Sequence, residues 1–308
     1  MVRRADDYAL YLTIAERTGA ILPALHFRPF VFRVLTLPVD MSSTPWMAVG
    51  ALCLATLCFA SPLSAQSNAA SDDDDDGVRV FSGYRFHLNA ATLIDDDERF
   101  NWDADYGGDI DVIDFGTGRF IFLANFEAIL GEELRAFDVN QGNYILEGTV
   151  THRLGSTEIG GTFHHVSRHV SDRPKNFPID WNMVGAQVWH RIDVNRIHLD
   201  VGARAFRTTQ RSFVDYAGEF GGYARLRYRL KERLAVIASA DAVYRPTDPS
   251  VVGRSGVSGG SIEGGVRFEG DAVAVELFVA VERRVDADPF DRLPRTWGMA
   301  GFRLLARE

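Results

Sequence analysis

His165, Ser167 and His169 occupy alternate positions in the segment 163–169, which reads FHHVSRH. Alternate residues of a β-strand project from the same face, so this spacing predicts that the three side chains lie together. The Cα atoms of His165 and Ser167 would be about 6.6 Å apart, which is close enough for a hydrogen bond between imidazole and hydroxyl. Such a pair, with a third group that orients the imidazole, is the core of a nucleophilic triad.

The following predicted strand supplies two polar residues at its start, Asp180 and Asn182. Its apolar alternate positions begin at Val184, and Asn182 and Asp180 continue the same face outward. If Phe163 lies opposite Val184 in an antiparallel pair, then His165 lies opposite Asn182. The hypothesis is therefore a serine, a histidine and an amide or carboxylate in one patch of the sheet surface.

The H-x-S spacing, with a polar residue on the next strand, resembles two families of outer-membrane lipid hydrolases, the outer-membrane phospholipase A and the lipid A deacylase. The resemblance covers these two strands and the general architecture. It implies that Ser167 is the nucleophile, that His165 is the general base, and that Asn182 or Asp180 orients the histidine. It also implies calcium as a cofactor if the chain is like the phospholipase. Arg168 follows the serine, whereas both families have Asn there.

The same residues have a second interpretation, as polar side chains of the membrane interface at the end of a strand. The residues by themselves indicate no cofactor and no metal. His165 and His169 would be about 13 Å apart along a strand, which is too far for two ligands of one zinc ion.

From residue 78 onward, segments of about 10 residues alternate apolar and polar side chains, which is the pattern of outer-membrane barrel strands. The predicted strands are 78–91, 108–115, 119–130, 143–154, 157–170, 181–192, 196–208, 216–230, 233–245, 259–269, 272–285 and 296–306. The fold class is therefore all-β, a transmembrane antiparallel barrel of about twelve strands. A barrel of ten strands is the alternative, because 108–115 is short and acidic.

The links between the predicted strands alternate between short turns and longer polar loops, as periplasmic turns and extracellular loops do in such barrels. The longer loops are predicted at 92–107, 131–142, 171–180, 209–215, 246–258 and 286–295. Proline removes a hydrogen bond from a β-ladder, so a closed barrel should exclude it from its strands. All prolines of the barrel region fall in the predicted long loops: Pro174, Pro178, Pro246, Pro249, Pro289 and Pro294.

The residues before the barrel carry a targeting signal. The run 46–59 is apolar over about 14 residues, which is shorter than the roughly 20 that a membrane-spanning helix needs. Small residues follow it up to Ala65, which is typical of signal-peptide cleavage near that residue. The predicted domains are a non-native upstream extension over 1–40, a signal peptide over 41–65, an acidic periplasmic tail over 66–77 and the barrel over 78–308. The predicted location is the bacterial outer membrane of a Gram-negative cell.

Charge and cysteine content narrow the classes further. The formal net charge of −9 argues against nucleic acid as a partner, because phosphate binding requires clustered Lys and Arg. Both cysteines, Cys53 and Cys58, lie in the apolar run, so the mature chain needs no disulfide. The expected partners are outer-membrane lipid and the barrel assembly machinery, and the sequence leaves the oligomeric state open.

Three functions fit these observations. The first is a structural or interaction barrel with a charged, largely closed lumen. The second is a serine-dependent lipid hydrolase of the outer leaflet. The third is a small anion-preferring channel, because Arg225, Arg227 and Arg229 form one predicted lumen stripe. The competing interpretation of that stripe is salt bridges to carboxylates across the lumen, with these expected partners: Glu147, Asp241, Glu263 and Glu276.

Overall fold

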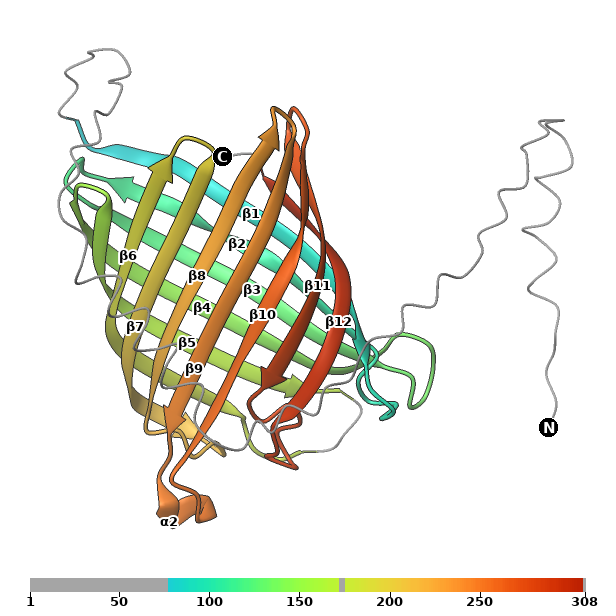
Figure 1. Cartoon of the computed structure of the whole chain (residues 1–308). Coiled ribbons are helices and arrows are strands. Elements are labelled where there is room, and N and C mark those ends of the chain that lie inside the picture. The colour runs from blue at the N-terminus through green and yellow to red at the C-terminus, as the bar shows by residue number, and fades with distance from the viewer. Residues whose placement is uncertain (1–76, 172–174, 307–308) are drawn as a thin grey trace, which may run out of the picture. The chain divides into compact units, whose positions relative to one another are not determined.

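The computed structural model describes residues 77–171 and 175–306, and these residues form a closed antiparallel barrel of twelve strands (Figure 1). The strands are β1 (Arg79–Ile94), β2 (Trp102–Asp114), β3 (Arg119–Gly131), β4 (Asp138–Leu154), β5 (Thr157–Val170), β6 (Asp180–Val194), β7 (Ile197–Ser212), β8 (Gly218–Lys231), β9 (Leu234–Pro246), β10 (Gly256–Glu269), β11 (Val273–Arg284) and β12 (Arg295–Ala306). The predicted all-β barrel of twelve strands is confirmed. The predicted upstream extension, signal peptide and nearly all of the acidic tail lie outside the described residues.

Each strand pairs with its neighbours in the chain, and β1 closes the barrel by pairing with β12. The links at one end are short turns, at 115–118, 155–156, 195–196, 232–233 and 270–272. We call this the turn end. The links at the other end, the loop end, are longer, and one of them contains the short helix α2 (Pro249–Val252) (Figure 1). The predicted alternation of short turns and long loops is confirmed among the described residues.

β2 is longer than predicted, and the ten-stranded alternative is wrong. The predicted loop 92–107 is in fact a loop at 95–101, because β2 already begins at Trp102. The sequence looks too acidic for a strand there, since Asp residues recur at alternate positions. The barrel places these carboxylates in the lumen opposite cationic groups, as in the pairs of Asp103 with Arg284 and Asp111 with Arg119. The acidic alternation is thus a lumen face and not a loop.

Pro246 is a smaller exception. It is the last residue of β9, so the prediction that every barrel proline lies in a loop is wrong at this position. The carbonyl of Pro246 accepts a hydrogen bond from the backbone N–H of Ala217, and the proline ends the ladder without interrupting it.

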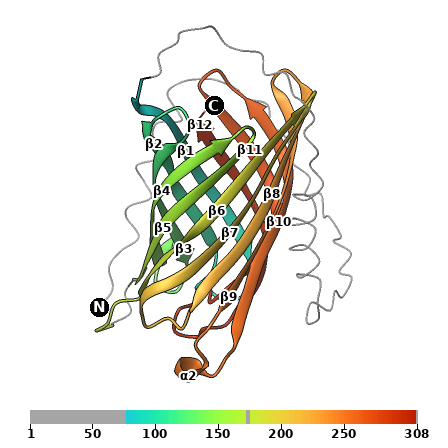
Figure 2. The same cartoon turned by 90° about the vertical axis from the view of Figure 1, so that its left-hand side faces the viewer.

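The outward face of the barrel is apolar and exposed. Side chains such as Phe122, Leu146, Phe163, Val184 and Leu277 leave between 39% and 49% of their surface uncovered. Figure 2 shows β4 to β7, the part of the wall that carries several of them. A continuous apolar exterior of this kind is rare on a monomeric protein in water and matches the lipid-facing band of an outer-membrane barrel. Within the described ranges, no helix is long and apolar enough to cross a bilayer.

The lumen is filled at the loop end. Two clusters of buried apolar side chains lie there and combine strand residues with loop residues. One includes Phe100 and Ala287 from the loops beside Trp297 of β12, and the other includes Tyr216 beside Trp181 of β6. Because aromatic side chains of this size are almost fully buried, the loop half of the lumen is a packed core.

The expected partners of the arginine stripe are wrong, although the stripe does face the lumen. Glu147 hydrogen-bonds His164, Asp241 hydrogen-bonds Ser261, and Arg303 binds both remaining carboxylates, Glu263 and Glu276. The stripe arginines instead have the following contacts: Arg225 with the ring of Tyr223, Arg227 with Glu269 and Arg229 with His198. Which carboxylate pairs with which arginine depends on how close the strands are around the barrel wall. The alternation of residues along the sequence does not contain that information.

Candidate functional site

The register of β5 and β6 is the one that the sequence predicts. Phe163 lies opposite Val184 and His165 lies opposite Asn182, while Ser167 lies opposite Asp180. Phe163 and Val184 are exposed on the outer face of the barrel, so by alternation the other two pairs project outward as well. The candidate site is therefore on the lipid side of the wall, near the loop end of the two strands.

His165 is held by Asn182. The distance from Nδ1 of His165 to Oδ1 of Asn182 is 2.6 Å. The amide nitrogen of Asn182 donates to Oε1 of Gln210 on β7 at 3.0 Å, which fixes the amide with its oxygen toward the imidazole. With the amide oxygen on Nδ1, the neutral imidazole of His165 has its lone pair on Nε2. That is the tautomer that a general base needs.

Ser167 contacts a different histidine from the expected one. Its Oγ lies 3.1 Å from Nε2 of His169, and no hydrogen bond to His165 is present among the described contacts. The ring of His169 in turn meets Tyr144 edge-on, with ring centroids 5.2 Å apart. Two contacts therefore lie side by side on the outer face. The hydroxyl of Ser167 contacts His169, and the amide of Asn182 contacts His165. The even spacing of the two histidines around Ser167 is the signal by which sequence reasoning could have found this second contact.

Asn182, and not Asp180, is the residue in contact with His165. Asp180 lies one step further toward the loop end, opposite Ser167. Gln210, which orients Asn182, was not among the predicted site residues. A bulge places it there, because the register of β6 and β7 shifts between Asn182 and Met183 and brings Gln210 opposite Asn182. No periodic pattern in the sequence predicts such a shift.

Arg168 faces the opposite way. Its guanidinium donates to Asn143 at 3.0 Å and to the backbone carbonyl of Asp286 at 2.8 Å, inside the barrel. Arg168, at the position where both resembled families have Asn, therefore makes its contacts in the lumen. Donors for a negatively charged oxygen on the outer face must then come from outward side chains, of which Gln210 is adjacent to Asn182.

An aromatic row leads to the site along the outer face. Tyr106 pairs with Phe126, Phe126 with Tyr144, and Tyr144 with Ser167, each on a neighbouring strand. The ring centroids of successive aromatic residues are 5.3 and 4.9 Å apart. Rows of exposed aromatic residues at one level of a barrel mark the interface between hydrocarbon and water. Ser167 therefore continues this aromatic row onto β5, near the loop end of the strands.

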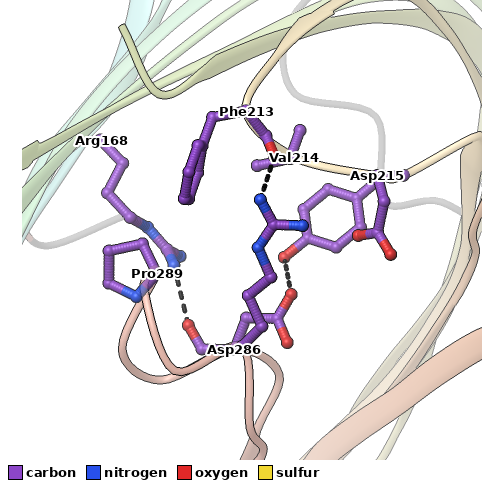
Figure 3. Close-up of a pocket in the computed structure, with 8 residues that line it drawn as sticks. Arg168, Phe213, Val214, Asp215, Asp286 and Pro289 are labelled. Atoms are coloured by element: carbon purple, nitrogen blue, oxygen red, sulfur yellow. Dashed lines mark hydrogen bonds between the residues drawn. The ribbon is translucent and has the colours of Figure 1, made fainter. Parts of the chain in front are cut away.

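Behind the site, the loop end is held by a buried ion cluster of Arg254, Asp215, Asp286 and Tyr216. Figure 3 shows the small cavity beside it, which Asp215 and Asp286 line. Arg254 donates to Asp215 at 2.6 Å and to Asp286 at 2.6 Å, and the hydroxyl of Tyr216 donates to Asp286 at 2.7 Å. The cavity beside the cluster, lined by Asp215, Tyr216 and Asp286 among others, has a volume of only about 10 Å³. The cluster ties the loops 213–217, 247–255 and 285–294 together across the lumen.

The electrostatics of the cluster stabilise its ionised form. Burial opposes ionisation of Asp286, but the hydrogen bonds from Arg254 and Tyr216 outweigh it and hold the pKa of this carboxyl below its ordinary value of 3.8. Burial raises the pKa of Tyr216 to about 12, so its hydroxyl remains a donor. The hydrogen bonds that Arg254 donates to the carboxylates of Asp215 and Asp286 raise the pKa of its guanidinium above its ordinary value.

Within the described ranges, no group of three or more His, Cys, Asp or Glu side chains is placed to hold a metal ion. The calcium that the phospholipase resemblance implies stays a prediction.

No protein-family model and no curated protein matches the sequence. Solved structures are similar in fold. LpxR from Salmonella typhimurium is 9% identical over 73% of this chain and 100% of its own, with a TM-score of 0.43. The outer membrane protein OmpT of Vibrio cholerae is 9% identical over 73% and 96%, with a TM-score of 0.40. The outer membrane protein Omp33 of Acinetobacter baumannii is 14% identical over 73% and 97%, with a TM-score of 0.35. These likenesses concern the barrel alone.

Proposed function

We propose that this barrel is a serine-dependent acyl hydrolase that acts on membrane lipid at its outer surface. The observation that carries the proposal is the hydrogen bond of 2.6 Å between Nδ1 of His165 and Oδ1 of Asn182, two residues from Ser167 on the same outward face. It prepares Nε2 of His165 to accept a proton, which is what activates a serine hydroxyl.

The proposed reaction begins with a rotation of Ser167. The side chain of a strand serine has three staggered positions, and a change between them moves Oγ from His169 toward His165. His165 then takes the hydroxyl proton while Oγ bonds to the ester carbonyl carbon. The bond from that carbon to the lipid alcohol breaks, and His165 returns the proton to the leaving oxygen. Water releases the fatty acid from Ser167 by the same steps, so one ester and one water give one acid and one alcohol.

The location of the site on the outer face indicates the class of substrate, which is membrane lipid. The apolar side chains toward the turn end, Phe163 and Val184, are exposed where acyl chains would contact the wall. Ser167 follows the aromatic row of Tyr106, Phe126 and Tyr144, and aromatic residues favour the boundary between hydrocarbon and water, which supports a site at that boundary. The ester bonds of membrane lipids lie at the boundary between headgroup and acyl chain, and they would therefore meet the serine without leaving the bilayer.

The channel interpretation has less support. A conducting pore needs a continuous aqueous path, and the loop half of this lumen is packed with buried aromatic residues and the cluster of Arg254. If the hydrolase proposal fails, the remaining interpretation is a structural or interaction barrel with a charged, largely closed lumen.

The test is release of fatty acid by protein purified from outer membranes, in mixed micelles with phospholipid or lipid A, with and without calcium. The parent is compared with Ser167→Ala, His165→Ala and His169→Ala. A matched control is Thr157→Ala, which removes another outward hydrogen bond between hydroxyl and imidazole, of 2.8 Å to His190, at the turn end of the same strands. We expect release to disappear in the first two variants and to persist in His169→Ala and Thr157→Ala.

Two results would contradict the proposal. Equal release by the parent and Ser167→Ala would assign the activity to a contaminant, and no release by a verified barrel would leave the non-catalytic interpretation. Loss of release in His169→Ala together with full release in His165→Ala would make His169 the base and overturn the role of Asn182.

A further inference from the structure

A second hollow lies in the lumen wall at the turn end, far from the outer face. It has a volume of about 430 Å³ and is formed by the ends of β8, β9 and β10 with their turns. Arg229 of β8 and Arg267 of β10 both lie opposite Ala235 of β9, so the three form one row on the lumen face. The two arginine backbones are therefore about 10 Å apart, two strand spacings. Ala235 between them is almost fully covered, with 2% of its surface exposed.

The hollow is positively charged in a negatively charged protein. Five cationic residues line it against two carboxylates, Glu232 and Glu269, whereas the whole chain has a formal net charge of −9. The cationic residues are Arg227, Arg229, Lys231, Arg233 and Arg267. Arg227 pairs with Glu269 at 3.7 Å and Arg233 with Asp271 at 2.8 Å. An excess of one charge on a concave surface, next to low-dielectric protein, attracts ions of the opposite sign.

The cations of the hollow differ in how they are held. Arg267 is fixed by Glu269 at 2.6 Å and by Glu276 at 3.1 Å. Arg229 donates to Nε2 of His198 at 2.9 Å, and among the described contacts it has no carboxylate partner. His198 is itself held by Asp193 through its other ring nitrogen. Arg229 is thus oriented by a neutral acceptor, and its charge is not cancelled.

This arrangement suits an oxyanion with several oxygen atoms. Guanidinium and ammonium groups bind phosphate through charge-assisted hydrogen bonds. Arg229 and Lys231 lie two residues apart at the end of β8 and both line the hollow, and neither has a carboxylate partner among the described contacts. The loop end of the same lumen is packed, so an anion that enters here is bound and not conducted.

We propose that the turn-end hollow binds a small phosphate-bearing anion from the compartment that the short turns face, with Arg229 and Lys231 of β8 as its ligands. In an outer-membrane barrel the short turns face the periplasm. The site is independent of the outward serine site, because it lies on the other face of the wall and at the other end of the strands.

The test uses inorganic pyrophosphate as the probe and isothermal titration of the protein in neutral detergent at low, constant ionic strength. The variants are Arg229→Gln and Ala235→Glu, and the matched control is Arg196→Gln. Arg196 lies in a turn at the same end of the barrel but does not line the hollow. We expect saturable binding of one pyrophosphate per barrel, weakened about tenfold or more in the two lining variants and less than about twofold in Arg196→Gln.

Two outcomes would overturn the proposal. One is the absence of saturable binding by a parent protein whose folding is verified by its heat-dependent migration in gels. The other is equal weakening in Arg229→Gln and Arg196→Gln, which would reduce the effect to the overall charge of the turn end. Ala235→Glu separates these cases further, since it adds a carboxylate to the floor of the hollow and removes no arginine.

Discussion

The two ends of the lumen use arginine in opposite ways. At the loop end, Arg254 lies between Asp215 and Asp286, whose side chains are 1% and 5% exposed. At the turn end, Arg233 meets Asp271 in a pair whose side chains are 65% and 82% exposed. Burial makes the first arrangement costly to disturb, whereas water and salt screen the second. The same residue type therefore holds a buried cluster at one end of the barrel and forms solvent-exposed contacts at the other.

The largest expected effect is on stability. Arg254→Ala leaves two buried carboxylates without their counterion, and we expect the free energy of unfolding to fall by about 3–5 kcal/mol. Arg233→Ala removes an arginine from an exposed pair and should cost no more than about 1 kcal/mol. Urea unfolding of each variant in lipid vesicles measures the difference. Equal losses would show that the loop-end cluster contributes no more than a surface pair.

The next effect concerns the outward site and separates the loop end from the turn end of β5 and β6. Asn182→Leu removes the acceptor of His165 without changing the strand, and we expect acyl release to fall about 100-fold or more. Thr157→Val removes the corresponding contact to His190 and should leave release unchanged. Initial rates of fatty-acid release measure both. A rate that is insensitive to Asn182→Leu would contradict the orienting role of this residue.

A third prediction concerns acid. Because the pKa of Asp286 is lower in the folded protein than its ordinary value of 3.8, its ionised form stabilises the loop end. That contribution is complete above pH 3.8 and is lost as the pH falls through the lower, folded value. We expect the fluorescence of the buried Trp181 to change below pH 3.8 and Asp286→Asn to remove that transition. A transition that persists in Asp286→Asn would assign it to another carboxyl.

The smallest effect is a difference in salt sensitivity. Raising the ionic strength from about 0.05 to 0.5 M shortens the screening length severalfold, so binding of pyrophosphate at the exposed turn end should weaken. The buried cluster of Arg254 should respond little, and the unfolding midpoint should stay nearly constant. Titration and unfolding at the two ionic strengths give both quantities. If pyrophosphate binding and the unfolding midpoint changed with salt to the same extent, the two ends of the lumen would not differ in their electrostatics.

The sequence predicts the wall of the barrel well, for a local reason. Alternation with a period of two depends only on which face each residue takes, and it predicts twelve strands and their turns. For β5 and β6 it excludes slips by one residue, because these would turn Phe163 or Val184 into the lumen. It does not exclude a slip by two residues, so the pairing of His165 with Asn182 followed only from the assumed pairing of Phe163 with Val184. The fold class and the location of the candidate site follow from this alternation alone.

Only the tertiary structure determined several contacts and one strand boundary that the alternation of residues does not predict. The start of β2 depends on cations that other strands bring to its aspartates, such as Arg284 of β11. The contact of Asn182 with Gln210 depends on a bulge, and Ser167 prefers His169 through a choice of rotamer.

The closed loop end depends on residues that meet only across the lumen, such as Asp215 and Asp286, which are brought to Arg254 from different loops. The face on which a side chain lies is set by its position within the strand. Its contact partner is set by the closure of the barrel, which brings together residues that are far apart in the chain.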